Sequence, residues 1–226
     1  MIFNDEMVRA ILNNRKTQTR RIMRNQPAGD TPETPVMIRN KNGAFQWYDD
    51  RYGESGFFPC PFGQQGDRIW VRETYRVHSK ATDVATLVYR ASVRNSWTEQ
   101  THRVPVYVCN KQVSPEKWTP SIHMPRWASR ILLEITDVRV ERLQDISDED
   151  ARAEGCWRGR GFGRPDLAVS LCDEFPTLWA SVYGEENWLA NPWVWVIEFK
   201  RIQEATSEQE NRQLAPIKVD CYVEAD

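Results

Sequence analysis

Three strand-like segments constrain the fold of this chain more than any other feature. Residues 129–142 contain ILLEITDVRVER, in which β-branched and apolar residues alternate with charged ones, as in a half-buried strand. Residues 192–201, PWVWVIEFKR, are nearly apolar throughout, and residues 67–77, DRIWVRETYRV, are rich in β-branched and aromatic side chains. We expect these segments to form neighbouring or near-neighbouring strands, with 192–201 as the closing strand.

Helices are few and lie at the ends of the strand-like segments. Asn4 or Asp5 can cap a helix that ends near Asn14, and Ser147 begins a second helix that Gly155 stops. The segment LAVSLCDEFPTLWASVYG has helical periodicity, but Pro176 predicts two helical pieces. Further short strands are expected in ATLVYRA and RVPVYVC. The pattern predicts an α+β fold, a small antiparallel or mixed β-barrel with peripheral helices.

The chain divides into one domain and a tail. We expect residues 1–203 to form a single domain with two long insertions, at about 26–65 and 79–128, and residues 204–226 to form a polar C-terminal tail. Residues 26–65 are rich in proline and glycine, and the Asn42-Gly43 turn before FQWY predicts one hairpin there.

Composition excludes several classes of protein. Hydrophobic residues make up 40% and charged residues 27%, and no apolar run approaches the roughly 20 residues that span a bilayer. The first 16 residues do not read as a secretory signal, so we expect a cytoplasmic protein without a membrane partner. The five cysteines form no CxxC pair and the three histidines lack ligand spacing. We therefore expect reduced thiols, no structural metal and no cofactor.

Charge is distributed unevenly along the chain. Residues 1–133 hold 20 Lys/Arg and 12 Asp/Glu, whereas residues 134–226 hold 10 and 20. The densest basic run is Arg15, Lys16, Arg20, Arg21 and Arg24, with no acid among them. This run is either a phosphate-facing surface or a solvated basic face. Among the ten tryptophans, Trp118, Trp127 and Trp157 lie in polar loops, where stacking on a nucleobase is one explanation.

Four separated motifs are specific enough to indicate a family. They are ILNNRKTQTRR at 11–21, Gly66-Asp67 with IWVRETY, LQDISDEDARAEG, and WVIEFKRI. Together they resemble ASCH-domain proteins of the PUA-like superfamily, in the larger form found in phages and prophages, and are similar to the small bacterial N4-acetylcytidine amidohydrolases. The resemblance implies a PUA-like barrel, with two insertions that the small enzymes lack.

The resemblance also implies catalytic roles. By motif position, Lys16 is the proton acceptor, Thr19 the nucleophile and Glu154 the proton donor, and all three should converge on one cleft. Amide hydrolysis needs these three functions, and nearby cations would lower the pKa of Lys16. The expected substrate-binding residues are Arg15, Thr17, Arg20, Arg21, Arg72, Glu73, Arg126 and Trp127.

Each catalytic assignment has a simpler alternative. Lys16 could be a solvated charge at a helix end, Thr17 and Thr19 could cap the turn, and Glu154 could be an exposed helical residue. The expected function is a metal-independent amidohydrolase acting on N4-acetylcytidine or a related modified nucleoside. The alternatives are a module that binds single-stranded RNA or a modified base without catalysis, and a ribonuclease, for which the sequence offers no histidine pair.

Overall fold

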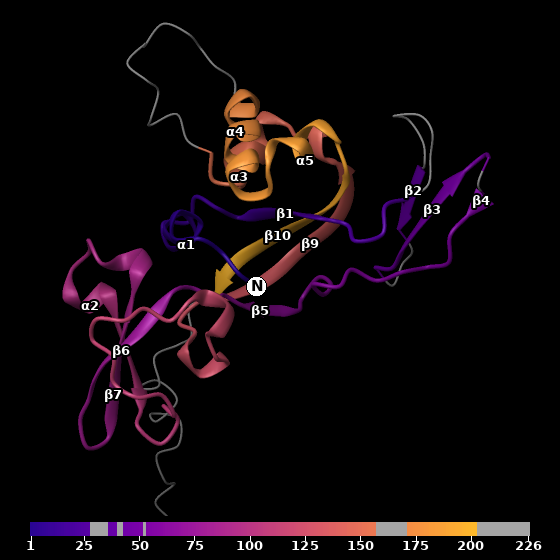
Figure 1. Ribbon diagram of the computed structural model, residues 1–226. Helices are drawn as coiled ribbons and strands as arrows, with labels where there is room; N and C mark the ends of the chain where they lie inside the picture. The colour runs from indigo at the N-terminus through magenta and orange to yellow at the C-terminus, as the bar shows by residue number, and fades with distance from the viewer. Residues whose placement is uncertain (28–35, 40–42, 52, 157–170, 203–226) are drawn as a thin grey trace, which may run out of the picture.

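The computed structural model describes residues 1–27, 36–39, 43–51, 53–156 and 171–202 (Figure 1). Trp157 and the expected tail at 204–226 lie outside these ranges. The described chain is a mixed α+β fold with three antiparallel sheets and few helices. No helix in the described ranges is long and apolar enough to cross a bilayer.

The main sheet has four strands in the order β1-β10-β9-β5 and carries the candidate site. Its strands are β1 (Gln18–Ile22), β5 (Arg68–Trp70), β9 (Leu132–Arg142) and β10 (Trp193–Ile202). The long strands β9 and β10 are antiparallel over their whole length, with one register shift at Glu198/Phe199. As expected, segments 129–142 and 192–201 are neighbouring strands.

The main sheet curls into a half-barrel, as the bend of β9 and β10 shows (Figure 1). The N-terminal segment pairs with the chain after β5, since the Phe3 amide donates to the Arg72 carbonyl at 3.3 Å and the Arg72 amide to the Met1 carbonyl at 2.7 Å. Val8, Ile11, Leu133, Ile197 and Phe199 belong to the core inside the curve. The sheet is thus a curled antiparallel half-barrel around an apolar core.

A small sheet within residues 26–65 contains the expected hairpin. Its strands are β2 (Val36–Arg39), β3 (Phe45–Asp49) and β4 (Gly53–Glu54), paired in that order. The rings of Phe45 and Phe58 meet Trp195 of β10 edge to face, with centroids 5.0 and 6.0 Å apart. This insertion therefore contributes side chains to the main core.

A third sheet has the order β6-β7-β8, with β6 (Tyr75–Lys80), β7 (Val84–Tyr89) and β8 (Thr101–Pro105). The expectation of one strand over 67–77 is wrong, because the chain leaves the main sheet after Trp70 and enters this sheet at Tyr75. Tyr75, Leu87 and Tyr89 form a separate core there.

The helices lie around these sheets and follow most of the expected capping signals. They are α1 (Asp5–Leu12), α2 (Trp97–Gln100), α3 (Asp148–Ala153), α4 (Leu171–Tyr183) and α5 (Glu185–Leu189), with 3-10 turns η1 (Arg90–Ser92), η2 (Ser121–His123), η3 (Arg126–Ala128) and η4 (Leu143–Asp145). Asn4 accepts a hydrogen bond from the amide of Met7, and Ser147 accepts one from the amide of Asp150. The predicted break at Pro176 is wrong, since α4 continues through it. Pro176 lies in the second turn, where the missing amide removes one hydrogen bond and leaves the later turns intact.

Candidate functional site

A buried ion pair joins Lys16 and Glu154, two residues of the candidate site that are far apart in the chain. Lys16 Nζ lies 2.5 Å from Glu154 Oε2 and also donates to the Glu154 carbonyl oxygen at 2.8 Å. The side chains are 0% and 5% exposed. The simpler interpretations of Lys16 as a solvated charge and of Glu154 as an exposed helical residue are therefore wrong.

Local backbone geometry brings the two residues together. After α1 the chain turns at Asn14, whose φ is 53°, and this turn directs Lys16 toward α3. Glu154 is the C-cap of α3, and Gly155 follows with a φ of 99°, a conformation that favours glycine. A Cβ on Gly155 would lie 3.5 Å from Lys16 Cβ, so the helix stop lies directly against the lysine.

Burial and pairing act on Lys16 in opposite directions. Desolvation is the largest influence and lowers the pKa of the Lys16 ammonium, while the nearby Glu154 carboxylate raises it in part. The net direction is downward, which increases the fraction of neutral amine at a given pH.

Glu154 also binds the strand that carries Thr19. Its Oε1 accepts a hydrogen bond from the backbone amide of Arg20 at 2.5 Å, so the carboxylate holds α3 against β1. Thr19 is fully buried, and its hydroxyl oxygen accepts a hydrogen bond from Arg21 Nη1 at 2.8 Å. Lys16 and Glu154 are in direct contact, and Thr19 is one residue from the amide that Glu154 binds.

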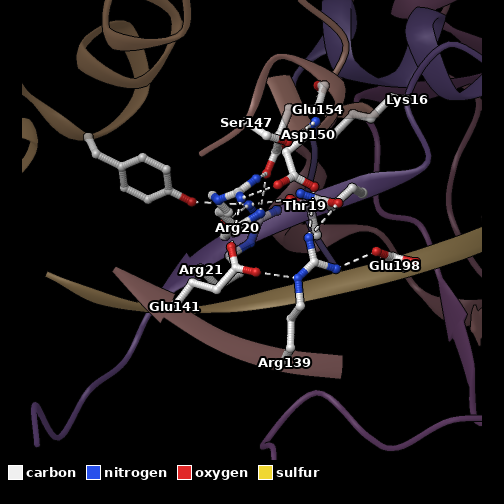
Figure 2. Close-up of polar contacts among 12 residues, drawn as sticks. Lys16, Thr19, Arg20, Arg21, Arg139, Glu141, Ser147, Asp150, Glu154 and Glu198 are labelled. Atoms are coloured by element: carbon white, nitrogen blue, oxygen red, sulfur yellow. Dashed lines mark hydrogen bonds and ion pairs between the residues drawn. The ribbon is translucent and has the colours of Figure 1, made fainter. Parts of the chain in front are cut away.

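Behind this group lies a network of arginines and carboxylates (Figure 2). Arg20 Nη2 lies 3.0 Å from Glu141 and 3.3 Å from Asp150. Arg139 donates to Asp150 at 2.7 Å and also binds Glu141 and Glu198. No sequence motif indicated this network, although the alternation of Arg139 and Glu141 in a half-buried strand places both side chains on one face.

Two hollows flank α3. The smaller, about 10 Å³, holds no more than one water, and it lies between β1, Glu154 and an apolar wall from α4 formed by Phe175, Leu178, Trp179, Val182 and Tyr183. The hydroxyl of Tyr183 accepts a hydrogen bond from Arg21 at 3.1 Å. Arg20 lines this hollow; its buried Nε and Nη1 form no hydrogen bond with the described residues, although Nη1 lies 3.8 Å from Glu154 Oε1 in an ion pair. The wider hollow, about 280 Å³, is polar and includes Thr17, Gln18, Asp150 and Glu198.

The expected substrate-binding residues do not gather in one place. Arg20 and Arg21 line the smaller hollow, and exposed Thr17 lines the wider one. Arg15 is half-buried beside Lys16 in the chain, and neither hollow includes it.

The remaining expected residues belong to the region of η2, η3 and the third sheet. Both carboxylate oxygens of Glu73 accept hydrogen bonds from Arg130 at 2.9 Å, and Glu73 is 1% exposed. Arg72 stacks on Trp70 and Trp127 packs edge-on against Tyr75, whereas Arg126 is exposed. None of these four lines either hollow.

The basic run at 15–24 is not a continuous surface. Lys16 is 2% exposed and Arg20 is 1% exposed, and carboxylates bind both. Neither a phosphate-facing surface nor a solvated face describes the whole run. Within the part of the chain that the structure describes, no three His, Cys, Asp or Glu side chains gather closely enough to hold a metal ion.

Comparison with known proteins found no matching family model, no matching curated protein and no matching solved structure.

Proposed function

We propose that this protein is an amidohydrolase that removes an acyl group from N4 of cytidine or a related modified nucleoside. The observation that carries the proposal is the contact of Lys16 with Glu154 at 2.5 Å, buried and next to the strand of Thr19. The resemblance to ASCH-domain proteins of the PUA-like superfamily selects the substrate class, and the curled half-barrel is consistent with that fold.

Proton transfer within the pair would prepare both groups for hydrolysis. A proton that moves from Lys16 to Glu154 leaves a neutral amine and a carboxylic acid, with no change in net charge. The amine can then accept the Thr19 proton as the hydroxyl oxygen attacks the acyl carbonyl, and the acid can protonate the departing N4 amine. Water hydrolyses the resulting threonine ester and regenerates the hydroxyl. The lowered pKa of Lys16 supports its role as proton acceptor.

Arg21 would stabilise negative charge near the nucleophile. Its guanidinium already donates to the Thr19 oxygen at 2.8 Å. A fixed cationic donor at this position lowers the energy of an oxygen that gains negative charge during attack. Arg21 is therefore proposed as an electrostatic partner of Thr19.

Access to Thr19 requires a rearrangement. Thr19 is fully buried, and of the three catalytic residues only Glu154 lines the hollow of about 10 Å³. This hollow cannot accept a nucleobase, and its outer wall consists of α4 side chains. We propose that α4 shifts outward when substrate enters. The bond between Arg21 and Tyr183 would then break, which frees Arg21 for the reacting atoms.

The test is incubation with N4-acetylcytidine, with and without EDTA, followed by mass spectrometry of the products. Cytidine and acetate should form at the same rate in both conditions, and Thr19→Val, Lys16→Met and Glu154→Gln should each lose turnover. Glu185→Gln, at an exposed carboxylate of α5 that lines neither hollow, is the control and should retain it. Wild-type protein without turnover at high concentration would refute the proposal and leave binding without catalysis as the alternative.

A further inference from the structure

The positive charge of the first part of the chain is concentrated in the third sheet and its loops. Residues 75–119 hold seven Lys/Arg and three Asp/Glu. The basic run at 15–24 contributes less surface charge than its sequence suggests, because Lys16 and Arg20 are buried and paired. Around β6, β7 and β8, by contrast, Lys80, Arg94 and Arg103 are exposed.

The face of this sheet opposite its core carries arginine and threonine side chains together with Val84 and Val88, of which Val88 is 1% exposed, and we call it the outer face. Tyr75, Val77, Leu87 and Val104 point into the sheet's own core. Strand alternation and register place the intervening residues on the opposite face: Arg76 lies across from Val88, and Thr86 lies across from Arg103. His78 lies at the register shift of β6.

The cations of the outer face are not neutralised by carboxylates. Arg76 and Arg103 form no ion pair with any described residue, in contrast to Arg20, Arg130 and Arg139 elsewhere. Arg76 Nε and His78 Nδ1 are buried yet have no hydrogen-bond partner among the described residues. The outer face thus offers unneutralised cationic groups and unsatisfied polar atoms.

Two tryptophan rings contact Arg76 and His78. The Trp118 ring lies under the Arg76 guanidinium at 4.8 Å, and the Trp97 ring meets His78 with centroids 5.0 Å apart. Trp97 is 51% exposed, although an indole ordinarily gains from burial. Trp118 is half-buried, so Trp97 is the exposed ring. A sheet face with unpaired arginines and an exposed aromatic ring is an arrangement that binds unpaired bases and their phosphates.

We infer that the outer face of the β6–β7–β8 sheet binds single-stranded RNA, with phosphates at Arg76 and Arg103 and a base stacked on Trp97. The inference is independent of the proposed hydrolysis, because it needs no residue of the Lys16–Glu154 site. An acidic protein segment could pair with Arg76 and Arg103, but it would not supply a flat ring to stack on Trp97. The hydroxyls of Thr86 and Thr101 on the same face can bond a ribose 2′-hydroxyl, which favours RNA over DNA.

The experiment measures fluorescence anisotropy of a labelled 12-nucleotide unstructured RNA over a range of salt concentrations. Wild-type affinity should fall as salt rises, and the Arg76→Gln/Arg103→Gln double variant should flatten the log-log slope by about 1.4, or about 0.7 per phosphate contact. Trp97→Ala should weaken binding roughly tenfold at every salt concentration and keep the slope.

Matched controls lie in the other sheets. Arg68→Gln changes an exposed arginine of β5, and Tyr48→Ala changes a 43% exposed aromatic residue of β3. Neither should alter affinity or slope. The inference would be overturned if the control variants lost as much RNA affinity as the test variants, or if wild-type protein bound no RNA at low salt. It would also be overturned if DNA of the same sequence bound with equal affinity, or if polyglutamate competed with the labelled RNA as well as unlabelled RNA does. Since the RNA carries no acylated base, these outcomes do not depend on whether the protein hydrolyses N4-acetylcytidine.

Discussion

Lys16 and Glu154 meet inside the protein although 138 residues separate them in the chain. The contact joins the turn that follows α1 to the C-terminus of α3, and the Glu154 carboxylate also accepts a hydrogen bond from the amide of Arg20. One carboxylate therefore connects three parts of the fold. Catalysis and stability should depend on the same pair.

Loss of the lysine charge should destabilise the protein. Lys16→Met leaves the buried Glu154 carboxylate without its nearest cation, with only Arg20 Nη1 at 3.8 Å, and removal of one partner of a buried pair costs about 3–5 kcal/mol. Urea denaturation measures the free energy of unfolding. Lys200→Met is the control, since Lys200 pairs with Glu134 but its side chain is 63% exposed, and its loss should cost less than about 1 kcal/mol. Similar values for both variants would contradict the buried-pair interpretation.

The contribution of the Asp150 carboxylate to the free energy of unfolding should disappear in acid. Burial opposes ionisation of this carboxyl, but Arg20, Ser147 and Arg139 outweigh burial and lower its pKa below the usual value. The folded state therefore favours the ionised form. The stability difference between wild type and Asp150→Asn should be complete above about pH 4, near the unfolded pKa, and should shrink as pH falls through the lower folded pKa.

Urea titrations from pH 3 to 6 follow that difference, with Glu149→Gln on the same helix as the control. A difference between wild type and Asp150→Asn that stays constant over this range would show that Asp150 stabilises the fold through its shape and not its charge.

The hydroxyl of Tyr183 should restrain α4. Tyr183→Phe removes the hydrogen bond from Arg21 and should lower stability by about 1 kcal/mol. If α4 shifts to admit substrate, the same change should lower KM for N4-acetylcytidine, because the closed state loses a stabilising contact. Steady-state kinetics measure this effect, and Tyr107→Phe, at an 89% exposed position, is the control. An increased KM would argue against outward movement of α4.

Replacement of Gly155 by alanine should lower both stability and turnover. Alanine at a φ of 99° is strained by about 1–2 kcal/mol, and its Cβ would also lie 3.4 Å from Ala10 and 3.5 Å from Lys16. Gly53→Ala is the matched control, with a φ of 75° and no atom within 4 Å. We expect Gly155→Ala to destabilise more and to reduce turnover, whereas Gly53→Ala should reduce stability alone. Thermal unfolding and the deacetylation assay compare the two variants.

Local signals in the sequence predicted much of the fold. The Asn42-Gly43 pair, the Ser147 cap, the Gly155 stop and the alternation in 129–142 are all signals that act within a few residues. The structure contains the β2–β3 hairpin, the cap, the stop and the strand that they predicted, while Asn42 itself lies outside the described residues. Strand β1 was missed, because QTRRI is polar and its burial depends on pairing with β10. The break between Trp70 and Tyr75 was missed for the same reason, since which sheet accepts a strand is decided by distant partners.

The candidate site was only partly predictable. Motif resemblance pointed to Lys16 and Glu154, which the structure brings into contact, but it also grouped Glu73 with them, and Glu73 pairs with Arg130. Arg139 and Glu141 were missed because a charged residue in a strand has no local signal that distinguishes a buried network from solvent contact. Such pairings depend on register between strands, which the sequence alone does not give.

Because β1 pairs with β10, the site can form only after β10 has been synthesised. Gln18 lies across from Glu198, and β10 is the only strand in the described chain that pairs with β1. During synthesis the ribosome therefore has to release almost every described residue before the segment that carries Thr19 finds its neighbour. A nascent chain that ends before Trp193 would carry Lys16, Thr19 and Glu154 without the strand that holds β1 in place.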